Sequence, residues 1–118
     1  MKIVYASRTG NVESVINTLG ISDALCISSG NESILEDYIL FTYTDGYGDI
    51  PGEVEAFLNA NSAHLKGVIA SGDMGYGEAF CQSGDKIAET YNVPYLYHFE
   101  NAGDANDIAK IQEILAQY

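Results

Sequence analysis

Residues 2–19 read KIVYASRTGNVESVINTL, and they carry the clearest signal of the fold. The stretch begins with an apolar run over residues 2–6, rich in the β-branched and aromatic side chains that favour strands. Small and hydroxyl-bearing residues follow, and residues 12–19 then place apolar side chains at helical spacing. Strand, polar loop and helix in this order predict the first part of an α/β sheet.

The same pattern recurs along the chain. Further strands are expected over residues 24–27, 38–43, 67–70 and 93–99, and further helices after Pro51 through residues 54–58, over 84–91 and over 105–118. These strand segments are apolar on both faces, which is typical of parallel strands covered by helices on both sides. We therefore predict a single α/β domain over residues 1–118. It is a doubly wound, five-stranded parallel sheet of order 2-1-3-4-5 with helices on both faces, as in the flavodoxin-like fold.

The composition excludes several classes of protein. Five Lys and Arg against 17 Asp and Glu give a formal charge of -12, which argues against nucleic acid or a membrane as a partner. A hydrophobic content of 47% argues against disorder. Cys26 and Cys81 have neither disulfide-framework nor metal-ligand spacing, so we expect reduced, buried thiols. Because no targeting or membrane segment is recognisable, a cytoplasmic protein is expected.

Glycines cluster in three segments that follow predicted strands. These segments are SRTGNV (residues 7–12), TYTDGYGDIP (42–51) and SGDMGYGEAF (71–80). In an open α/β sheet, ligands bind outside the carboxyl ends of the strands, where the strand order reverses. The three segments are therefore expected to form one site at that edge of the sheet.

The first segment suits a phosphate group. Ser7 and Thr9 supply hydroxyls, Gly10 and Asn11 lead into a helix, and a helix N-terminus attracts anions through its free N–H groups. The same residue types are also ordinary helix caps, so this segment alone leaves both interpretations open. Arg8 is the one cation expected near the phosphate, since Lys2 and Lys66 begin strands at the opposite edge.

The second and third segments place aromatic side chains beside glycines. Tyr43, Tyr47, Tyr76 and Phe80 could each simply cover the core. Together with a phosphate loop, however, they suit a phosphorylated planar ligand, and FMN fits best.

The chain resembles the NrdI family, the small flavodoxin-like proteins that accompany class Ib ribonucleotide reductases. The resemblance spans nearly the whole length. It depends on SRTGN after the first strand, on the compact glycine-rich loop after the third, and above all on GVIASGDMGYGEAFCQSGDKIAETYNVPYLYHFE (residues 67–100).

This resemblance implies bound FMN and an accessory role distinct from that of a metabolic enzyme. The reduced flavin would react with dioxygen and deliver superoxide or peroxide to the radical-generating dimanganese subunit of the reductase, supporting assembly of its tyrosyl radical. A flavin reductase or a thioredoxin-type reductase would be the electron donor. The flavin supplies this chemistry, so no catalytic acid or base is needed.

The resemblance also implies the residues that hold the cofactor. The phosphate would lie on Ser7, Arg8, Thr9, Gly10, Asn11 and Val12. The flavin ring would lie between two groups of residues: Thr42, Tyr43, Thr44, Asp45, Gly46, Tyr47 and Gly48 on one side, and Ser71, Gly72, Asp73, Tyr76, Gly77 and Phe80 on the other. Gly46 or Gly48 is the expected place for a peptide flip at flavin N5, because glycine changes the sign of φ at little cost.

Negative charge is expected to surround the ring. Asp45, Asp49, Glu53, Asp73 and Glu78 would together oppose a reduced, anionic flavin. The chain has no Trp, so a Trp-stacked flavin is excluded and the ring should be open to dioxygen.

The chain lacks the residues that three other classes of phosphate-handling protein need. The chain has no GxxxxGK[ST] motif, no arginine after either cysteine, and no acidic cluster after the first strand. These absences argue against a P-loop NTPase, a cysteine phosphatase and a response-regulator receiver. His64 is expected at the surface and His98 in the core or at a sheet edge, so no metal site is predicted. An electron-carrier flavodoxin and a cofactor-free interaction module stay open as alternatives.

Overall fold

The computed structural model spans residues 1–118 and describes all of them except residues 74, 76 and 78–80. The sheet is formed by β1 (Lys2–Tyr5), β2 (Leu25–Cys26), β3 (Tyr38–Thr42), β4 (Leu65–Gly72) and β5 (Tyr95–Glu100). The helices are α1 (Asn11–Thr18), α2 (Gly52–Asn61), α3 (Gln82–Tyr91) and α4 (Ala105–Leu115), with a short 3-10 helix, η1 (Ser62–His64), before β4.

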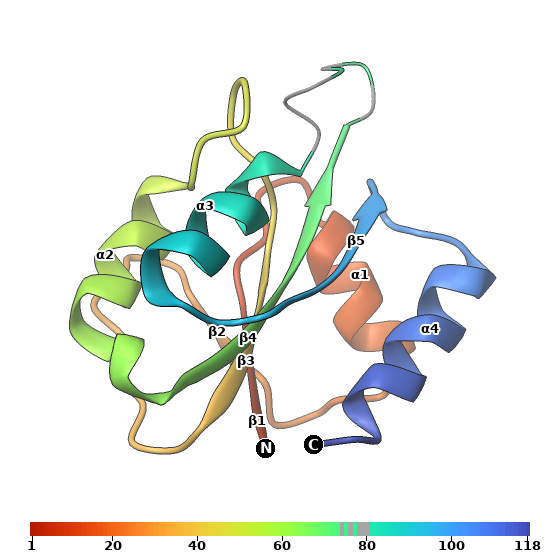
Figure 1. The fold of residues 1–118 in the computed structure, drawn as a ribbon. Coiled ribbons are helices and arrows are strands. Elements are labelled where there is room, and N and C mark those ends of the chain that lie inside the picture. Colours follow the sequence, from red (N-terminus) through yellow and green to blue (C-terminus); the bar gives the residue numbers. More distant parts are fainter. Residues whose placement is uncertain (74, 76, 78–80) are drawn as a thin grey trace.

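The sheet confirms the predicted topology. Its five strands pair in parallel in the order β2-β1-β3-β4-β5 (Figure 1). All the carboxyl ends of the strands therefore lie at one edge of the sheet. The loop after β3 rises from this edge, whereas both chain termini lie at the opposite end of the molecule (Figure 1).

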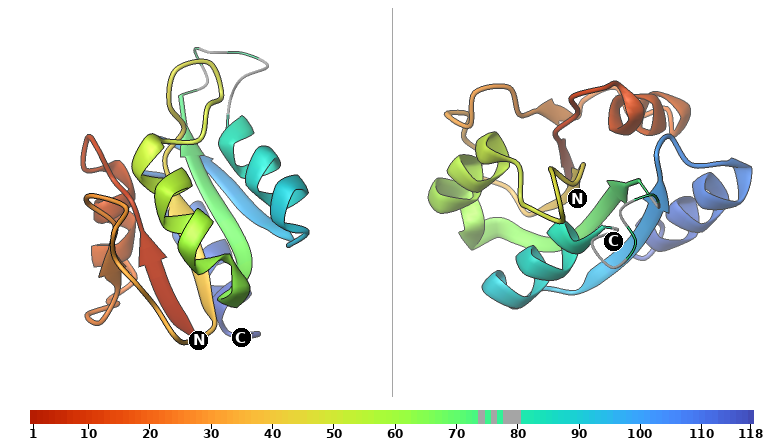
Figure 2. Two further views of the ribbon diagram at one scale, coloured as in Figure 1. Left: turned by 90° about the vertical axis from the view of Figure 1, so that its left-hand side faces the viewer. Right: turned by 90° about the horizontal axis from the view of Figure 1, so that it is seen from above.

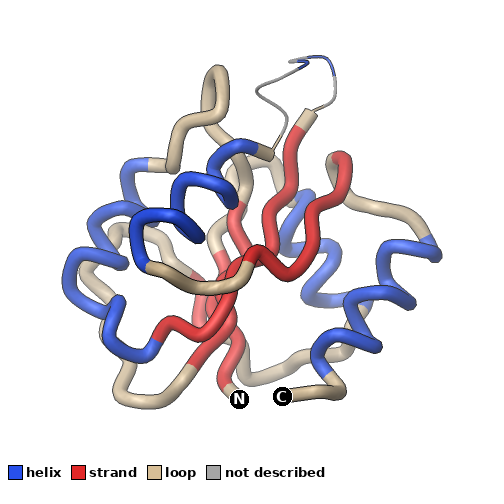
Figure 3. Tube along the Cα trace, in the orientation of Figure 1, coloured by secondary structure: helices blue, strands red, loops and turns tan. Residues whose placement is uncertain are grey.

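Helices cover both faces of the sheet, as expected. Helices α2 and α3 cover one face and α1 and α4 cover the other (Figures 2 and 3). The central strand β3 is buried throughout and divides its side chains between the two faces. Tyr38 and Leu40 pack with α2 and α3, whereas Ile39 and Phe41 pack with α1 and α4. This two-sided burial explains why the strand segments are apolar without alternation.

Several predicted boundaries are shifted. Strand β4 is longer than the apolar run over residues 67–70, because Leu65 pairs with Tyr38 and the strand continues to Gly72. Pro51 lies one position before α2 instead of in its first turn. Helix α4 ends at Leu115, before the predicted end.

The loop between β2 and β3 is held by two side chains. The Glu32 carboxylate accepts hydrogen bonds from the backbone amides of Ser28, Ser29 and Gly30, at 2.9, 3.2 and 3.0 Å. Asn61, buried at the end of α2, accepts from the Ile34 amide at 3.0 Å and donates to the carbonyl of Glu32 at 3.0 Å. The loop is therefore joined to α2 although it has no regular secondary structure.

The prediction of two buried thiols is wrong for one of them. Cys81 is buried, but Cys26 is exposed. Strand β2 has only two residues and lies at the edge of the sheet, so no further strand covers its outer side. Within the described residues, no helix has the length and apolar character needed to span a membrane.

Candidate functional site

A cleft lies at the edge of the sheet where the carboxyl ends of β1, β3 and β4 meet. Its volume is about 210 Å³. All three glycine-containing segments contribute to its lining, which consists of Ser7, Arg8, Thr9, Asn11, Val12, Tyr43, Thr44, Gly46, Ser71, Gly72, Asp73, Cys81 and Asn101. The strand order thus brings together residues up to 94 positions apart, from Ser7 to Asn101.

The wall from the first segment contains the N-terminus of α1. Gly10 is the N-cap, at φ 89°, and as a glycine it has no side chain that could cap the helix. Ser7 Oγ accepts from the amide of Glu13 at 3.3 Å. Among the described residues, the amides of Asn11 and Val12 have no acceptor. Two free N–H groups at a helix N-terminus, beside the Ser7 and Thr9 hydroxyls, form a suitable cradle for a phosphate.

The wall from the second segment is a tight turn over residues 45–49, which we call the β3 turn. Its first and last residues form an isolated antiparallel bridge, with Asp45 N–H donating to Asp49 O at 2.9 Å and Asp49 N–H to Asp45 O at 2.7 Å. Gly46 and Gly48 both have positive φ, 47° and 94°. Glycine adopts such angles at the lowest cost, which explains the two glycines at positions 46 and 48.

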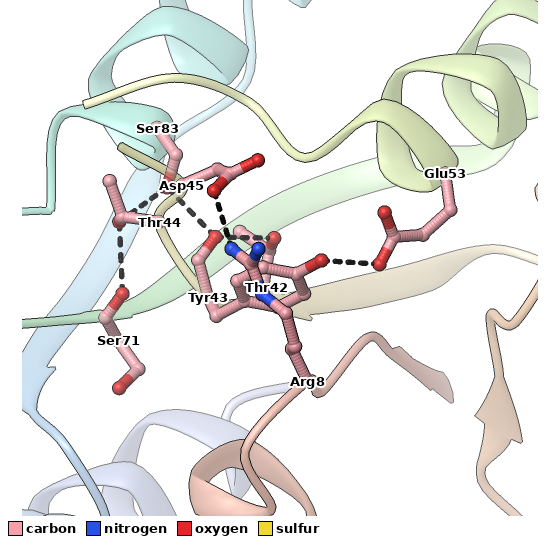
Figure 4. A network of polar contacts seen from close by, with 8 residues as sticks. All are labelled: Arg8, Thr42, Tyr43, Thr44, Asp45, Glu53, Ser71 and Ser83. Atoms are coloured by element: carbon pink, nitrogen blue, oxygen red, sulfur yellow. Dashed lines mark hydrogen bonds and ion pairs between the residues drawn. The ribbon is translucent and has the colours of Figure 1, made fainter. Parts of the chain in front are cut away.

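Tyr43, at the base of this turn, lies between two charged side chains (Figure 4). The Arg8 guanidinium lies over its ring, 4.8 Å from the centroid, and its hydroxyl donates to Glu53 at 2.5 Å. Burial, followed by this bond to Glu53, raises the pKa of Tyr43 well above its usual range. Tyr43 is therefore a neutral donor, and Arg8 reaches across the cleft from the first segment to the second.

Hydroxyl groups join the β3 turn to the neighbouring strand and helix. Thr44 Oγ1 donates to the carbonyl of Ser71 at 2.9 Å and lies 2.8 Å from Ser83 Oγ (Figure 4). Ser83 Oγ also lies 3.3 Å from the carbonyl of Tyr43, so the two hydroxyl protons are shared among the Ser71 carbonyl, the Tyr43 carbonyl and each other. Ser83 is fully buried in the first turn of α3, so this chain fixes the base of the turn against β4 and α3.

Two cleft residues were missing from the predicted site. Cys81 is buried beside the cleft, its Sγ lies 3.7 Å from the carbonyl of Ala70, and burial raises its thiol pKa to about 12. This supports a packing role over a redox role. Asn101 follows β5, where its carbonyl accepts from Ser71 Oγ at 2.6 Å. Its position directly after a strand, at the same edge as the glycine segments, was the signal that could have identified it.

The structure does not bring every predicted residue to the cleft. Six described residues do not line it: Gly10, Thr42, Asp45, Tyr47, Gly48 and Gly77. Thr42 is fully buried, whereas the Tyr47 side chain is 78% exposed. Tyr76 and Phe80, expected beside the ring, and Glu78, expected at its rim, lie outside the described residues.

The carboxylates expected around the ring are partly neutralised. Asp45 pairs with Arg8 at 2.5 Å, which lowers the pKa of that carboxyl group, and Asp49 pairs with Lys86 at 3.3 Å. Glu53 accepts from Tyr43, and Asp73 accepts from the amide of Gly75 at 2.8 Å. Lys86 is thus a second cation close to the predicted site, beyond the Arg8 that the sequence indicated.

The two histidines lie away from the cleft. His64 Nδ1 lies 3.1 Å from Asp37 near the amino end of β4, and His98 is exposed on the edge strand β5. Among the residues that the structure describes, no group of three or more His, Cys, Asp or Glu side chains could hold a metal ion.

The parallel sheet of order 2-1-3-4-5, with a cleft at the ends of β1, β3 and β4, defines a flavodoxin-like protein. Two solved flavodoxins share the fold. A short-chain flavodoxin associated with a non-canonical PDU bacterial microcompartment superposes with a TM-score of 0.76 at 20% identity, covering 98% of this chain and 93% of its own. The two-electron reduced flavodoxin of Megasphaera elsdenii gives 0.68 at 20% identity, covering 99% and 98%.

The chain belongs to the NrdI flavodoxin-like family. The model of that family, described as "NrdI Flavodoxin like", matches residues 3–113. The curated "Protein NrdI" of Macrococcus caseolyticus is 42% identical in an alignment of 118 positions, and the alignment covers 97% of this chain and 91% of that protein. This confirms the resemblance argued from the sequence.

FMN is the cofactor of this family, and the cleft fits it. Free amides at the start of α1 offer donors for a phosphate. Gly46 and Gly72 line the cleft, and because a glycine has no side chain, a flat ring system can approach the backbone at both positions.

Proposed function

We propose that this protein holds FMN in the cleft and supports a class Ib ribonucleotide reductase. The observation that carries the proposal is the open N-terminus of α1 facing a glycine-walled cleft, in a chain that belongs to the NrdI family. When bound and reduced, FMN would supply electrons that convert dioxygen to superoxide or, with two electrons and two protons, to hydrogen peroxide. The recipient would be the dimanganese subunit that generates the tyrosyl radical.

The residues of this chain would bind and orient the cofactor. The amides of Asn11 and Val12, with the hydroxyls of Ser7 and Thr9, would hold the phosphate. The β3 turn and the residues that follow β4 would contact the ring. Asp73 and the carboxylates of the turn would oppose negative charge on it, which favours electron release.

The phosphate assignment is tested by comparing FMN with riboflavin, which lacks the phosphate. We expect Thr9→Asp to weaken FMN binding at least about tenfold, because a carboxylate beside the phosphate repels it, and to leave riboflavin binding unchanged. Thr18→Asp, at the other end of α1, is the matched control. Equal loss of both ligands in Thr9→Asp would contradict the assignment, and no FMN binding by the unmodified protein would leave only the cofactor-free alternative.

The reductase role is tested by reconstitution. The FMN-loaded, reduced protein is mixed with the manganese-loaded radical subunit and dioxygen, and the tyrosyl radical is measured by electron paramagnetic resonance. We expect radical formation to depend on this protein. If an unrelated reduced flavodoxin gives the same radical yield, the general electron-carrier alternative is favoured.

The peptide flip expected at the β3 turn belongs to the same proposal. Gly46 and Gly48 already have positive φ, so either peptide can rotate without a steric penalty from a Cβ atom. We expect Gly46→Ala or Gly48→Ala to change the separation of the two one-electron potentials. Wild-type potentials in both variants would rule out a flip at these positions.

A further inference from the structure

The β3 turn is held by cations from two different elements. Arg8, in the loop after β1, pairs with Asp45 at 2.5 Å, and Lys86, on α3, pairs with Asp49 at 3.3 Å. Asp45 and Asp49 are the first and last residues of the turn, and their backbones form its closing bridge. The two ion pairs therefore hold both residues of the closing bridge, one from the loop after β1 and the other from α3.

Two of the few cationic side chains of this protein bind the β3 turn. The chain has five Lys and Arg residues against 17 Asp and Glu. Each of the five is within 4.0 Å of a carboxylate, and two of them are committed to a single turn of five residues. In a protein with a charge of -12, two of the few positive charges thus stabilise the wall of the candidate FMN site.

Helix α3 contacts the β3 turn at two levels. Ser83 binds Thr44, directly before the turn, and Lys86, three residues later on the same face of the helix, binds Asp49, the last residue of the turn. Ser83 is fully buried, whereas the Lys86 side chain is 44% exposed and that of Asp49 is 71% exposed. The contact of α3 with Thr44 is consequently shielded from solvent at Ser83, whereas its contact with Asp49 is one that water and salt can weaken.

We propose that Lys86 is a positioning residue of the candidate FMN site, which holds the β3 turn in the observed conformation in a salt-dependent manner. The inference rests on the proposed function only where it concerns FMN. Exposed ion pairs are screened as the Debye length falls from about 10 Å at 0.1 M salt to about 3 Å at 1 M. Higher salt therefore weakens the attachment of Asp49 to α3 and loosens the closing bridge of the turn that forms one wall of the site.

The first experiment uses the FMN-free protein. Hydrogen exchange is measured by NMR at the amides of Gly48 and Asp49, which both donate to the Asp45 carbonyl. At low salt we expect Lys86→Met to exchange these amides about two- to five-fold faster than wild type, the range for an exposed ion pair, and Lys86→Arg to restore slow exchange. At about 1 M salt the difference should disappear.

Lys110→Met is the matched control. Lys110 pairs with Glu113 on α4 at 3.8 Å, so the variant removes the same charge from another exposed ion pair. We expect it to exchange like wild type at the β3 turn. Equal exchange rates in wild type, Lys86→Met and Lys110→Met would overturn the inference, and this result does not depend on whether FMN binds.

The second experiment separates positioning from charge alone. FMN dissociation constants are measured for wild type, Lys86→Met, Lys110→Met and the double variant Lys86→Met/Asp49→Asn, which restores the net charge without restoring the ion pair. We expect Lys86→Met to bind FMN several-fold more weakly than wild type, and the double variant to bind it as weakly as Lys86→Met does. Recovery in the double variant, or equal affinity in Lys86→Met and Lys110→Met, would overturn the inference. Absence of binding by wild type would instead overturn the proposed function.

Discussion

Acidic side chains hold both the loop after β2 and the β3 turn, but their carboxylates bind different kinds of partner. In the first, the Glu32 carboxylate binds three successive backbone amides of its own loop, and buried Asn61 attaches that loop to α2. In the β3 turn, Asp45 and Asp49 bind cations from distant elements, and all four side chains are partly exposed.

The difference concerns what holds each segment in place. Hydrogen bonds to backbone amides and to a buried amide side chain are less sensitive to salt than exposed ion pairs, because they act over a short distance between fixed partners. Exposed ion pairs respond to salt and contribute little to stability. The loop after β2 is therefore part of the framework, whereas the β3 turn, at the cleft, can be adjusted without unfolding the protein.

The largest effect is expected where the framework loop is broken. Asn61→Ala removes the bonds to Glu32 and Phe57 and leaves the buried amide of Ile34 without its acceptor. The free energy of unfolding should fall by about 2–4 kcal/mol. Urea denaturation measures this, with Asn17→Ala on the exposed side of α1 as control, expected within about 0.5 kcal/mol. A loss in Asn61→Ala as small as in the control would remove the distinction between the two regions.

The next effect should appear in redox potentials and not in stability. Asp73→Asn and Asp45→Asn each remove a carboxylate at or beside the cleft. A charge ~10 Å from the ring at an effective dielectric constant of ~20 corresponds to about 1.7 kcal/mol, so each variant should raise the potentials by up to about 70 mV. Asp23→Asn, at the opposite edge, should leave them unchanged. Unshifted potentials in both cleft variants would show that the acidic rim does not act on the ring.

Acid should weaken the loop after β2 through Glu32. The bonds from the Ser28 amide and its neighbours lower the pKa of Glu32 from 4.5 to about 2. Because the folded-state pKa is the lower one, this stabilisation is complete above the unfolded value and is lost as the pH falls from about 4.5 toward 2. Glu32→Gln should be about 1 kcal/mol less stable at neutral pH, with a flatter profile across that window. Parallel pH profiles for the two proteins would contradict this.

The smallest effect is expected from breaking the turn itself. Arg8→Gln removes the pair with Asp45 and the contact with the Tyr43 ring, yet its side chain is 55% exposed. The free energy of unfolding should change by less than about 1 kcal/mol at low salt and should not change at high salt. Denaturation at both salt concentrations checks this, and a larger, salt-independent loss would place the turn with the framework.

Much of the fold could be predicted because its signals are local. Runs such as Tyr38–Thr42 are apolar on both faces, and glycine-rich segments follow them, which is enough for a parallel α/β sheet with a cleft at the carboxyl ends of its strands, whereas the strand order was taken from the flavodoxin-like fold. Boundaries were less accurate, since pairing such as that of Leu65 with Tyr38 extends a strand beyond its apolar run. The error at Cys26 has the same origin, because a two-residue edge strand gives no sequence signal of which side stays open.

The site was predictable where its residues follow strands, and not where they come from helices. The first segment and the β3 turn carry glycines and hydroxyls that mark them as loops at the ligand edge. Ser83 and Lys86 lie within an ordinary amphipathic helix, and their partners are 39 and 37 residues away in sequence. Such long-range polar contacts leave no pattern in the sequence, so only the three-dimensional arrangement shows them.

The contrast between the two thiols has a practical consequence. Cys26 is exposed on β2, whereas Cys81 is buried and its pKa of about 12 keeps it protonated at neutral pH. A maleimide dye should therefore attach at a single position without mutagenesis, since alkylation requires an accessible thiolate. The natural chain thus offers a built-in labelling site, from which a fluorophore could report docking of a partner protein.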